Sequence, residues 1–147
     1  MSDSSVSIRS LEDTDIGGVT ALDEKIGGTY RPDVWERRIT YYLRRDPEAS
    51  AVAESNGALV GFMLGEVRSG EFGLEEPTGW VEVLGVDPDV RGQAIGRRLA
   101  ERMLGHFRQR GAKRVRTLVD GEMPEIAAFF KALGFERADL EPLVLDL

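Results

Sequence analysis

A run of small and basic residues follows an apolar segment in the middle of this 147-residue sequence. The apolar segment stops at Asp87-Pro88, and the run that follows, from Arg91 to Arg98, reads RGQAIGRR. A strand that turns directly into a helix brings several backbone N–H groups to the positive end of the helix dipole. Small residues let an anion approach that backbone, and arginines add positive charge, so the run predicts a phosphate-binding turn. The alternative is an ordinary strand–turn–helix junction with a glycine near the helix cap.

The elements that must position this turn follow from hydrophobic periodicity. Asn56-Gly57 is a strong signal for a tight hairpin in which both turn residues have positive φ. Strands joined both by hairpins and by helices indicate a mixed α/β sheet with helices on both faces. Strands are expected at Val6–Arg9, Ser50–Ser55, Ala58–Val67, Trp80–Val86, Val115–Val119, Phe135–Leu140 and Leu143–Leu147, and helices at Leu11–Ile26, from Pro32 past Leu43, at Ile95–Arg110 and at Pro124–Leu133.

Composition excludes several classes of function. With 41% hydrophobic residues and no apolar run of membrane-spanning length, the chain is expected to be a single globular domain over residues 1–147, with no membrane partner. The net charge of -7 disfavours nucleic-acid binding. No cysteine and one histidine argue against a thiolate nucleophile and against a metal centre. The first residues, MSDSS, do not resemble a signal peptide, so a cytoplasmic location is expected.

The basic run does not match the P-loop or the G-x-G-x-x-G fingerprint. Residues 91–96, RGQAIG, resemble instead the pyrophosphate-binding signature R/Q-x-x-G-x-G/A of the GNAT superfamily of acetyl-CoA-dependent N-acetyltransferases. Leu84–Pro88 is similar to the central strand of that family and its exit, and Phe129–Phe135 is similar to its closing helix. The order of elements agrees with the family from Val6 to Leu147.

The resemblance implies a mixed, mostly antiparallel sheet of six to seven strands with a splay between the two central strands. Backbone groups of Leu84 and Val86 would pair with the pantetheine arm of acetyl-CoA, and amides from Gln93 to Arg97 would hold the pyrophosphate. The acetyl group would then lie beside Leu84 and Val119. The residues expected to bind the cofactor are Leu84, Gly85, Val86, Arg91, Gly92, Gln93, Ala94, Ile95, Gly96, Arg97 and Phe130. Dimers are common in the family, so a homodimer is possible, and no metal is expected.

Three residues depart from the family pattern. Ala94 replaces the first glycine of the signature, which we expect to be tolerated only if its φ is negative. Met123 replaces an asparagine that often contacts the cofactor near the start of the last helix. Phe130 replaces the tyrosine that often protonates the departing thiolate.

Two carboxylates are candidates for the base that accepts the proton of the amine. Glu82 lies two residues before Leu84, and strand alternation predicts that both side chains lie on one face. Asp120, at the end of the next strand, is the second candidate. A solvated or arginine-paired Glu82 and a helix-capping Asp120 are the structural alternatives. Tyr30, in the loop between the first two helices, is the expected contact to the acceptor substrate.

The sequence therefore predicts an N-acetyltransferase that moves an acetyl group from acetyl-CoA to a primary amine of a small molecule or of a protein. A non-catalytic acyl-CoA-binding or sensing module is the first alternative. A domain that binds a different phosphorylated ligand at the same turn is the second.

Overall fold

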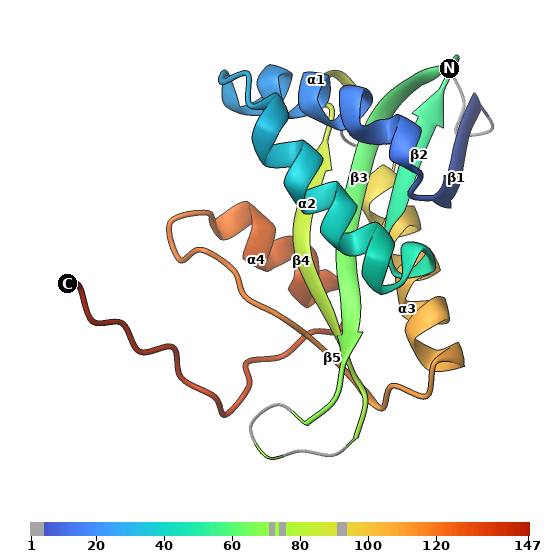
Figure 1. The fold of residues 1–147 in the computed structure, drawn as a ribbon. Helices are drawn as coiled ribbons and strands as arrows, with labels where there is room; N and C mark the ends of the chain where they lie inside the picture. The colour runs from blue at the N-terminus through green and yellow to red at the C-terminus, as the bar shows by residue number, and fades with distance from the viewer. Residues whose placement is uncertain (1–4, 71–72, 74–75, 91–93) are drawn as a thin grey trace. The chain divides into compact units, whose positions relative to one another are not determined.

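The computed structural model describes residues 5–70, 73, 76–90 and 94–147 (Figure 1). Two compact units make up the chain, Met1–Thr117 and Leu118–Leu147. Among the described residues, the first unit contains the sheet and three α-helices, and the second contains one further α-helix and the C-terminal segment. A single domain over the whole chain stays a prediction.

The first unit is built on a five-stranded sheet in which the strands lie in chain order. Neighbouring strands are antiparallel except for the last pair, β4 and β5, which are parallel. The expected mixed, mostly antiparallel sheet is therefore confirmed. The strands are β1 (Val6–Ser10), β2 (Ala51–Ser55), β3 (Ala58–Arg68), β4 (Thr78–Val86) and β5 (Arg114–Thr117).

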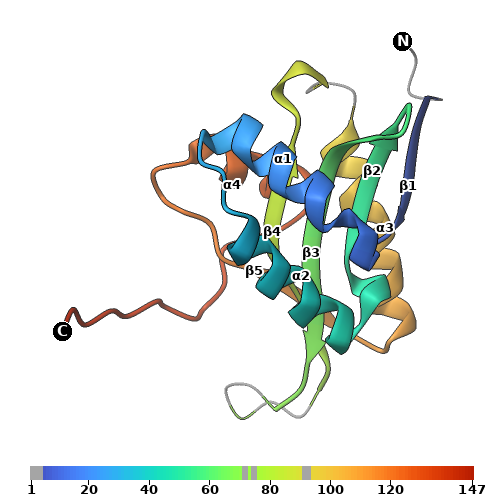
Figure 2. The same cartoon turned by 45° about the horizontal axis from the view of Figure 1, so that its top comes forward.

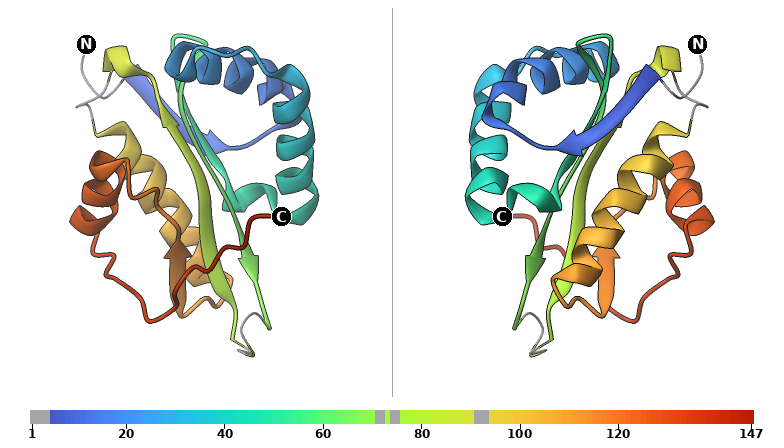
Figure 3. Two further views of the ribbon diagram at one scale, coloured as in Figure 1. Left: turned by 90° about the vertical axis from the view of Figure 1, so that its left-hand side faces the viewer. Right: turned by 90° about the vertical axis from the view of Figure 1, so that its right-hand side faces the viewer.

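Helices cover both faces of this sheet, as predicted (Figures 2 and 3). α1 (Ile16–Gly27) and α2 (Pro32–Arg45) lie on one face, and α3 (Ile95–Gln109) lies on the other. Burial of their apolar stripes against the sheet supplies the main stabilisation of these helices. The core on the α1 and α2 side consists of Leu11, Val19, Leu22, Trp35, Ile39, Tyr42, Val52, Phe62 and Leu64.

Glycines in the sheet allow α3 to pack closely on the opposite face. A Cβ atom added at Gly79 would lie 2.7 Å from the ring of Phe107, and one added at Gly65 would lie 2.9 Å from Cε of Met103. Phe107 and Met103 are fully buried on α3. Gly65 and Gly79 therefore mark the α3 face of β3 and β4.

The hairpin between β2 and β3 has the predicted turn. Asn56 has φ 53° and Gly57 has φ 80°, and Ser55 pairs with Ala58 across the two-residue loop. The first helix, in contrast, begins at Ile16 and not at Leu11, because a 3₁₀ turn at Asp13–Asp15 precedes it. It ends as predicted, with Gly28 in the left-handed region at φ 84°.

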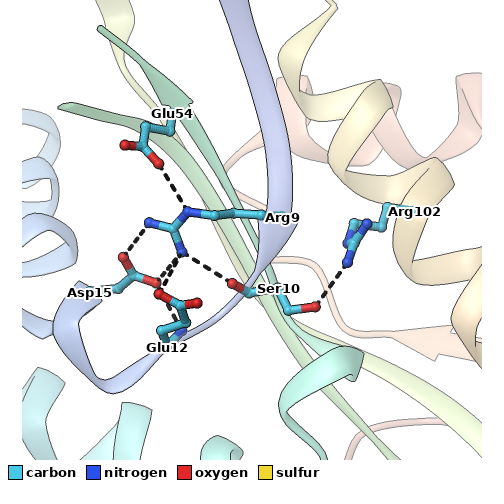
Figure 4. A network of polar contacts seen from close by, with 6 residues as sticks. All are labelled: Arg9, Ser10, Glu12, Asp15, Glu54 and Arg102. Atoms are coloured by element: carbon cyan, nitrogen blue, oxygen red, sulfur yellow. Dashed lines mark hydrogen bonds and ion pairs between the residues drawn. The ribbon is translucent and has the colours of Figure 1, made fainter. Parts of the chain in front are cut away.

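An arginine-centred network joins β1 to this 3₁₀ turn and to β2 (Figure 4). Arg9 donates two hydrogen bonds to the Asp15 carboxylate, at 2.9 and 2.7 Å, and one to Glu54 at 2.9 Å. Asp15 is buried and also accepts a hydrogen bond from the Glu12 amide at 2.9 Å. These carboxylates raise the pKa of Arg9 further above its usual range. The network fixes the edge strand to the helical layer.

The second unit contains α4 (Pro124–Ala132) and no strand among its described residues. The expectation of six to seven strands is therefore wrong for the structure, which has five over the described residues. Residues 135–140 and 143–147 were expected to form the last two. Local propensity on either side of Pro142 produced that expectation, but a strand also needs a neighbour to complete its hydrogen bonds. The side chains of Leu143 and Val144 instead remain 92% and 90% exposed.

Candidate active site

The N-terminus of α3 is where the phosphate-binding turn was predicted. Arg91, Gly92 and Gln93 lie outside the described residues. Ala94 is the N-cap and has φ 60° and ψ 23°, in the left-handed region. The condition under which an alanine was expected to be tolerated here, a negative φ, is therefore not met. A left-handed alanine costs about 1–2 kcal/mol that glycine does not, which explains physically why the family signature has a glycine at this position.

The first turn of α3 carries basic residues and no acidic ones. Ile95 is buried and anchors the turn against β3, where a Cβ added at Gly61 would lie 3.0 Å from Cγ2 of Ile95. Arg98 donates a hydrogen bond to the carbonyl of Val6 at 3.0 Å, and Arg97 lies 3.7 Å from Glu101 one turn later. Gly96 is in the first turn, where backbone amides have no partner within the helix. The local charge and the amides suit an anion.

Strand β4 continues beyond its ladder with β5. The last parallel pair is Val81 with Thr117, where the Thr117 hydroxyl also donates to the Val81 carbonyl at 2.8 Å. β4 extends five residues further, to Val86, and includes Leu84 and Gly85. This part of β4 pairs with β3 on its other side. The edge of β4 that faces away from β3 is therefore where an extended ligand would add as a strand.

Glu82 is the extra residue of a β-bulge. Leu64 pairs with Val83 and Gly65 pairs with Val81, which leaves Glu82 without an opposite residue in β3. The bulge shifts the alternation of side chains along β4. Val83 packs against the core under α1 and α2, and Leu84 pairs with Met63.

The prediction that Glu82 and Leu84 share a face is consequently wrong. Glu82 bonds to Arg68, whose guanidinium lies over the Trp80 ring at 5.0 Å on the α2 side. Leu84 pairs with Met63 of β3. The neighbours of Met63, Phe62 and Leu64, belong to the core under α1 and α2, so Met63 and Leu84 lie on the opposite, α3 side. Periodicity of two holds only in an unbulged strand.

Arg68 holds the Glu82 carboxylate. Its Nη2 donates to Glu82 Oε1 at 2.8 Å, and the Glu82 side chain is 28% exposed. Burial raises the pKa of Glu82 above the usual range, Arg68 opposes this, and the nearby Glu66 carboxylate raises it further. Glu82 thus combines partial solvent access with a basicity greater than that of an ordinary glutamate.

Glu66 was not predicted as a site residue. It lies on β3 and its side chain is 1% exposed. Its Oε1 accepts hydrogen bonds from the Tyr41 hydroxyl at 2.9 Å and from Arg68 Nε at 3.2 Å, and lies 3.3 Å from Nη2 of Arg45. The signal that could have identified it is a charged residue in the apolar run FMLGEV, because a buried carboxylate needs partners.

Asp120 and Phe130 belong to the second unit. Asp120 Oδ1 accepts a hydrogen bond from the Glu122 amide at 2.9 Å, and its carbonyl accepts one from the Met123 amide at 3.0 Å. Asp120 therefore forms a turn before α4, and Met123, not Asp120, is the N-cap of that helix. Phe130 is buried, with its ring centroid 5.1 Å from those of Phe129 and Phe135. No role of either residue in the reaction follows from these contacts.

Tyr30 lies in the loop between α1 and α2 and is 65% exposed. Arg31, beside it, is tied to Asp23 by hydrogen bonds of 3.1 and 2.9 Å. The loop is thus fixed at Arg31 while the tyrosine ring is available to a ligand.

No helix among the described residues is long and apolar enough to cross a membrane. Over the same residues, no group of three or more histidine, cysteine, aspartate or glutamate side chains is placed to hold a metal ion.

Comparison with known proteins gives a family match. A model described as the acetyltransferase (GNAT) family matches residues 19–135. A mycothiol acetyltransferase of Thermobispora bispora is 39% identical over 92 residues, which are 63% of this chain and 31% of that protein. An uncharacterized N-acetyltransferase of Methanocaldococcus jannaschii is 29% identical over 112 residues, 76% of this chain and 50% of its own. The chain therefore spans between about a third and half of the length of these two relatives.

Solved structures share the fold. An aminoglycoside N-acetyltransferase in complex with CoA superposes with a TM-score of 0.82 at 20% identity, over 96% of this chain and 94% of that one. The glucosamine-6-phosphate N-acetyltransferase of Arabidopsis thaliana gives a TM-score of 0.74 at 18% identity, over 95% and 97% of the two chains. At these identities the likeness concerns the fold alone.

Proposed function

Because this chain belongs to the acetyltransferase (GNAT) family of acyltransferases, we propose that it transfers an acetyl group from acetyl-CoA directly to a primary amine of a small molecule or of a protein. The observation that carries the proposal is the continuation of β4 past its ladder with β5, followed, after a 3₁₀ turn at Pro88–Val90, by the N-terminus of α3. A strand edge suits the extended pantetheine arm, and a basic helix N-terminus suits the pyrophosphate.

The proposed cofactor contacts follow from these two features. Backbone groups of Leu84 and Val86, on either side of Gly85, pair with the pantetheine arm. Amides from Gln93 to Arg97, with the side chains of Arg91 and Arg97, hold the pyrophosphate. Gly92, Ala94, Ile95 and Gly96 shape that turn, and Phe130 stays a cofactor contact that the family resemblance implies.

The chemical step joins the amine nitrogen to the acetyl carbon and breaks the bond from that carbon to sulfur. An alkylamine with a pKa of ~10.4 must first lose a proton, which costs roughly 4.6 kcal/mol at pH 7. Glu82 accepts this proton directly or through water, and the Leu84 N–H polarises the thioester carbonyl. Asp120 is the second candidate for the base.

The departing thiolate needs less assistance. A thiol with a pKa near 8.5 costs only about 2 kcal/mol to release as thiolate at pH 7, so water can supply the proton that a tyrosine would otherwise give. Phe130 in place of a tyrosine is therefore compatible with turnover. It also motivates the second candidate function, a module that binds acyl-CoA without transferring the acyl group.

The acceptor lies beyond the cofactor site, and we propose that it contacts Tyr30. The names of the relatives are compatible with a small-molecule amine, and a peptide amine fits the same chemistry. A single domain, a cytoplasmic location and a homodimer belong to this proposal as well.

Isothermal titration of the purified chain with acetyl-CoA, with CoA and ATP as comparators, tests the cofactor site. We expect micromolar binding of acetyl-CoA that persists in excess ATP. Equal competition by ATP would favour a site for another phosphorylated ligand, and absence of binding would contradict the proposal. CoA release with a panel of amines then separates an acetyltransferase from a binding module, which would bind the cofactor without releasing CoA.

A further inference from the structure

Two carboxylates of neighbouring strands share one guanidinium. Arg68 donates through Nε to Glu66 at 3.2 Å and through Nη2 to Glu82 at 2.8 Å. The guanidinium is itself held over the Trp80 ring at 5.0 Å. Arg68 therefore has one preferred orientation, and Glu82 is placed by it.

Glu66 is too deeply buried to meet a substrate. Its side chain is 1% exposed, and its Oε2 has no hydrogen-bond partner among the described residues. Oε1 accepts the hydrogen bonds from Tyr41 and Arg68 and forms the ion pair with Arg45. A buried carboxylate with one unpartnered oxygen is costly for the fold. Such a cost is typical of a group kept for a purpose other than stability.

The groups that face Glu82 come from two elements. β3 contributes Glu66 and Arg68, and α2 contributes Tyr42. Burial and the charge of Glu82 raise the pKa of Tyr42 to about 12. Tyr42 is therefore neutral at physiological pH. Two arginines of α2 also lie near this cluster: Arg38 interacts with Tyr42 and Arg45 with Glu66. The charged groups that shift the pKa of Glu82 are Arg68 and Glu66.

We propose that Glu66 is a positioning residue for Glu82. Because Glu66 and Glu82 share Arg68, the guanidinium fixes the orientation of the Glu82 carboxylate without fully neutralising the charge of Glu82. The inference rests on the proposed function only in assigning Glu82 as the base. Glu66 touches neither substrate nor cofactor. Its effect passes through Arg68 and through the electrostatic repulsion between two carboxylates.

The direction of the effect follows from the contacts. Glu66 raises the pKa of Glu82, and Arg68 lowers it. In a Glu66→Gln variant the repulsion is lost and Arg68 becomes available to Glu82 alone. The pKa of Glu82 should then fall, by about one unit for a neighbouring charge at this range. Glu82 becomes a weaker base, and the acid limb of kcat/KM moves to lower pH.

Carboxyl ¹³C NMR tests the coupling through the Glu82 signal. The Glu82 titration is followed in the unaltered protein and in a folded Glu66→Gln variant. Because the Glu66 charge raises the pKa of Glu82, Glu66→Gln should move this titration to lower pH. An unmoved Glu82 titration in the folded Glu66→Gln variant would overturn the inference.

The matched control is Glu54→Gln. Glu54 also pairs with an arginine on a neighbouring strand, Arg9, at 2.9 Å, but it has no contact with Arg68 or Glu82 among those described. Glu54→Gln should leave the Glu82 titration and the acid limb of kcat/KM in place. An equal shift in both variants would mean that any lost carboxylate on the sheet has this effect, and would contradict a specific role of Glu66.

The two proposals fail in different ways. If Glu82→Gln keeps the turnover and pH profile of the unaltered protein while NMR shows the coupling, the base assignment fails and the coupling stands. If Glu82→Gln loses turnover while Glu66→Gln leaves the Glu82 titration unmoved, the positioning role alone fails.

Discussion

Two arginines of the same sheet bind carboxylates in different ways. Arg9 bonds to Asp15 and Glu54, with Glu12 at 3.7 Å, and the buried Asp15 is further bound by a backbone amide (Figure 4). Arg68 bonds to Glu66 and Glu82, but one oxygen of Glu66 has no hydrogen-bond partner in the described chain. The first network uses its charges to hold β1, whereas the second keeps a carboxylate more basic than usual.

A β-bulge accounts for part of this difference. Glu54 lies beside an irregularity between β2 and β3 but keeps a partner on each side, Ser7 of β1 and Leu59 of β3, whereas Glu82 is itself the extra residue of β4. The bulge presents Glu82 beside Arg68 at the point where the ladder with β5 has ended. Similar residues on adjacent strands are therefore structural in one place and suited to proton transfer in the other.

The largest effect is expected from Glu82→Gln, which removes the carboxylate but keeps its shape. Turnover at pH 7 should fall by about 100-fold or more, the usual contribution of a general base. The loss should be smaller at pH 9, where more of the amine is already neutral. Rates of CoA release between pH 6 and pH 9 measure this loss. A Glu82→Gln variant with the same turnover and pH profile as the unaltered protein would exclude Glu82 as the base.

Arg9→Met tests the other side of the comparison. It leaves the buried Asp15 without its cation, so the free energy of unfolding should fall by about 2 kcal/mol, a value reduced because Arg9 is partly exposed. Urea denaturation measures the change. The pH profile of turnover should be unmoved in the folded variant, and a moved profile would show that the Arg9 network also affects the site.

Ala94→Gly should stabilise the chain. Glycine relieves the left-handed strain at the N-cap of α3, and its greater freedom in the unfolded state offsets part of the gain, which leaves about 1 kcal/mol. Thermal unfolding should occur at higher temperature, and acetyl-CoA should bind at least as tightly by titration calorimetry. A destabilised Ala94→Gly variant would contradict the φ of 60°.

The smallest effect on stability is expected from Tyr30→Ala, because Tyr30 is 65% exposed. The free energy of unfolding should change by less than about 0.5 kcal/mol. If Tyr30 contacts the acceptor, KM for the amine should rise while the affinity for acetyl-CoA stays the same. An unchanged KM would remove Tyr30 from the acceptor site.

Local patterns predicted much of the fold. Asn56-Gly57 specified the hairpin because its turn requires two positive φ angles. The buried residues at every fourth position, from Ile95 to Phe107, specified α3. The expected strands after α4 did not form, because periodicity describes one chain segment and not the neighbour that must pair with it.

The site was less predictable because it departs from regular geometry. Nothing in the residues around Glu82 distinguishes a bulged strand from a regular one, so the sheet face of the Glu82 side chain was assigned wrongly. The φ of Ala94 depends on the path of the chain into α3, and an alanine gives no indication of a left-handed residue. Glu66 carried a usable signal, a carboxylate within an apolar run, but its partners on α2 are distant in sequence.

Direct acetyl transfer is the central claim, and acetyl-CoA labelled in the acetyl group tests it most directly. The labelled cofactor is incubated with the chain and a panel of primary amines, and CoA, labelled amide and labelled protein are measured in one sample. We predict labelled amide and CoA in equal amounts and no label on the denatured protein. Bound acetyl-CoA with neither product, or label retained covalently on the protein, would contradict direct transfer.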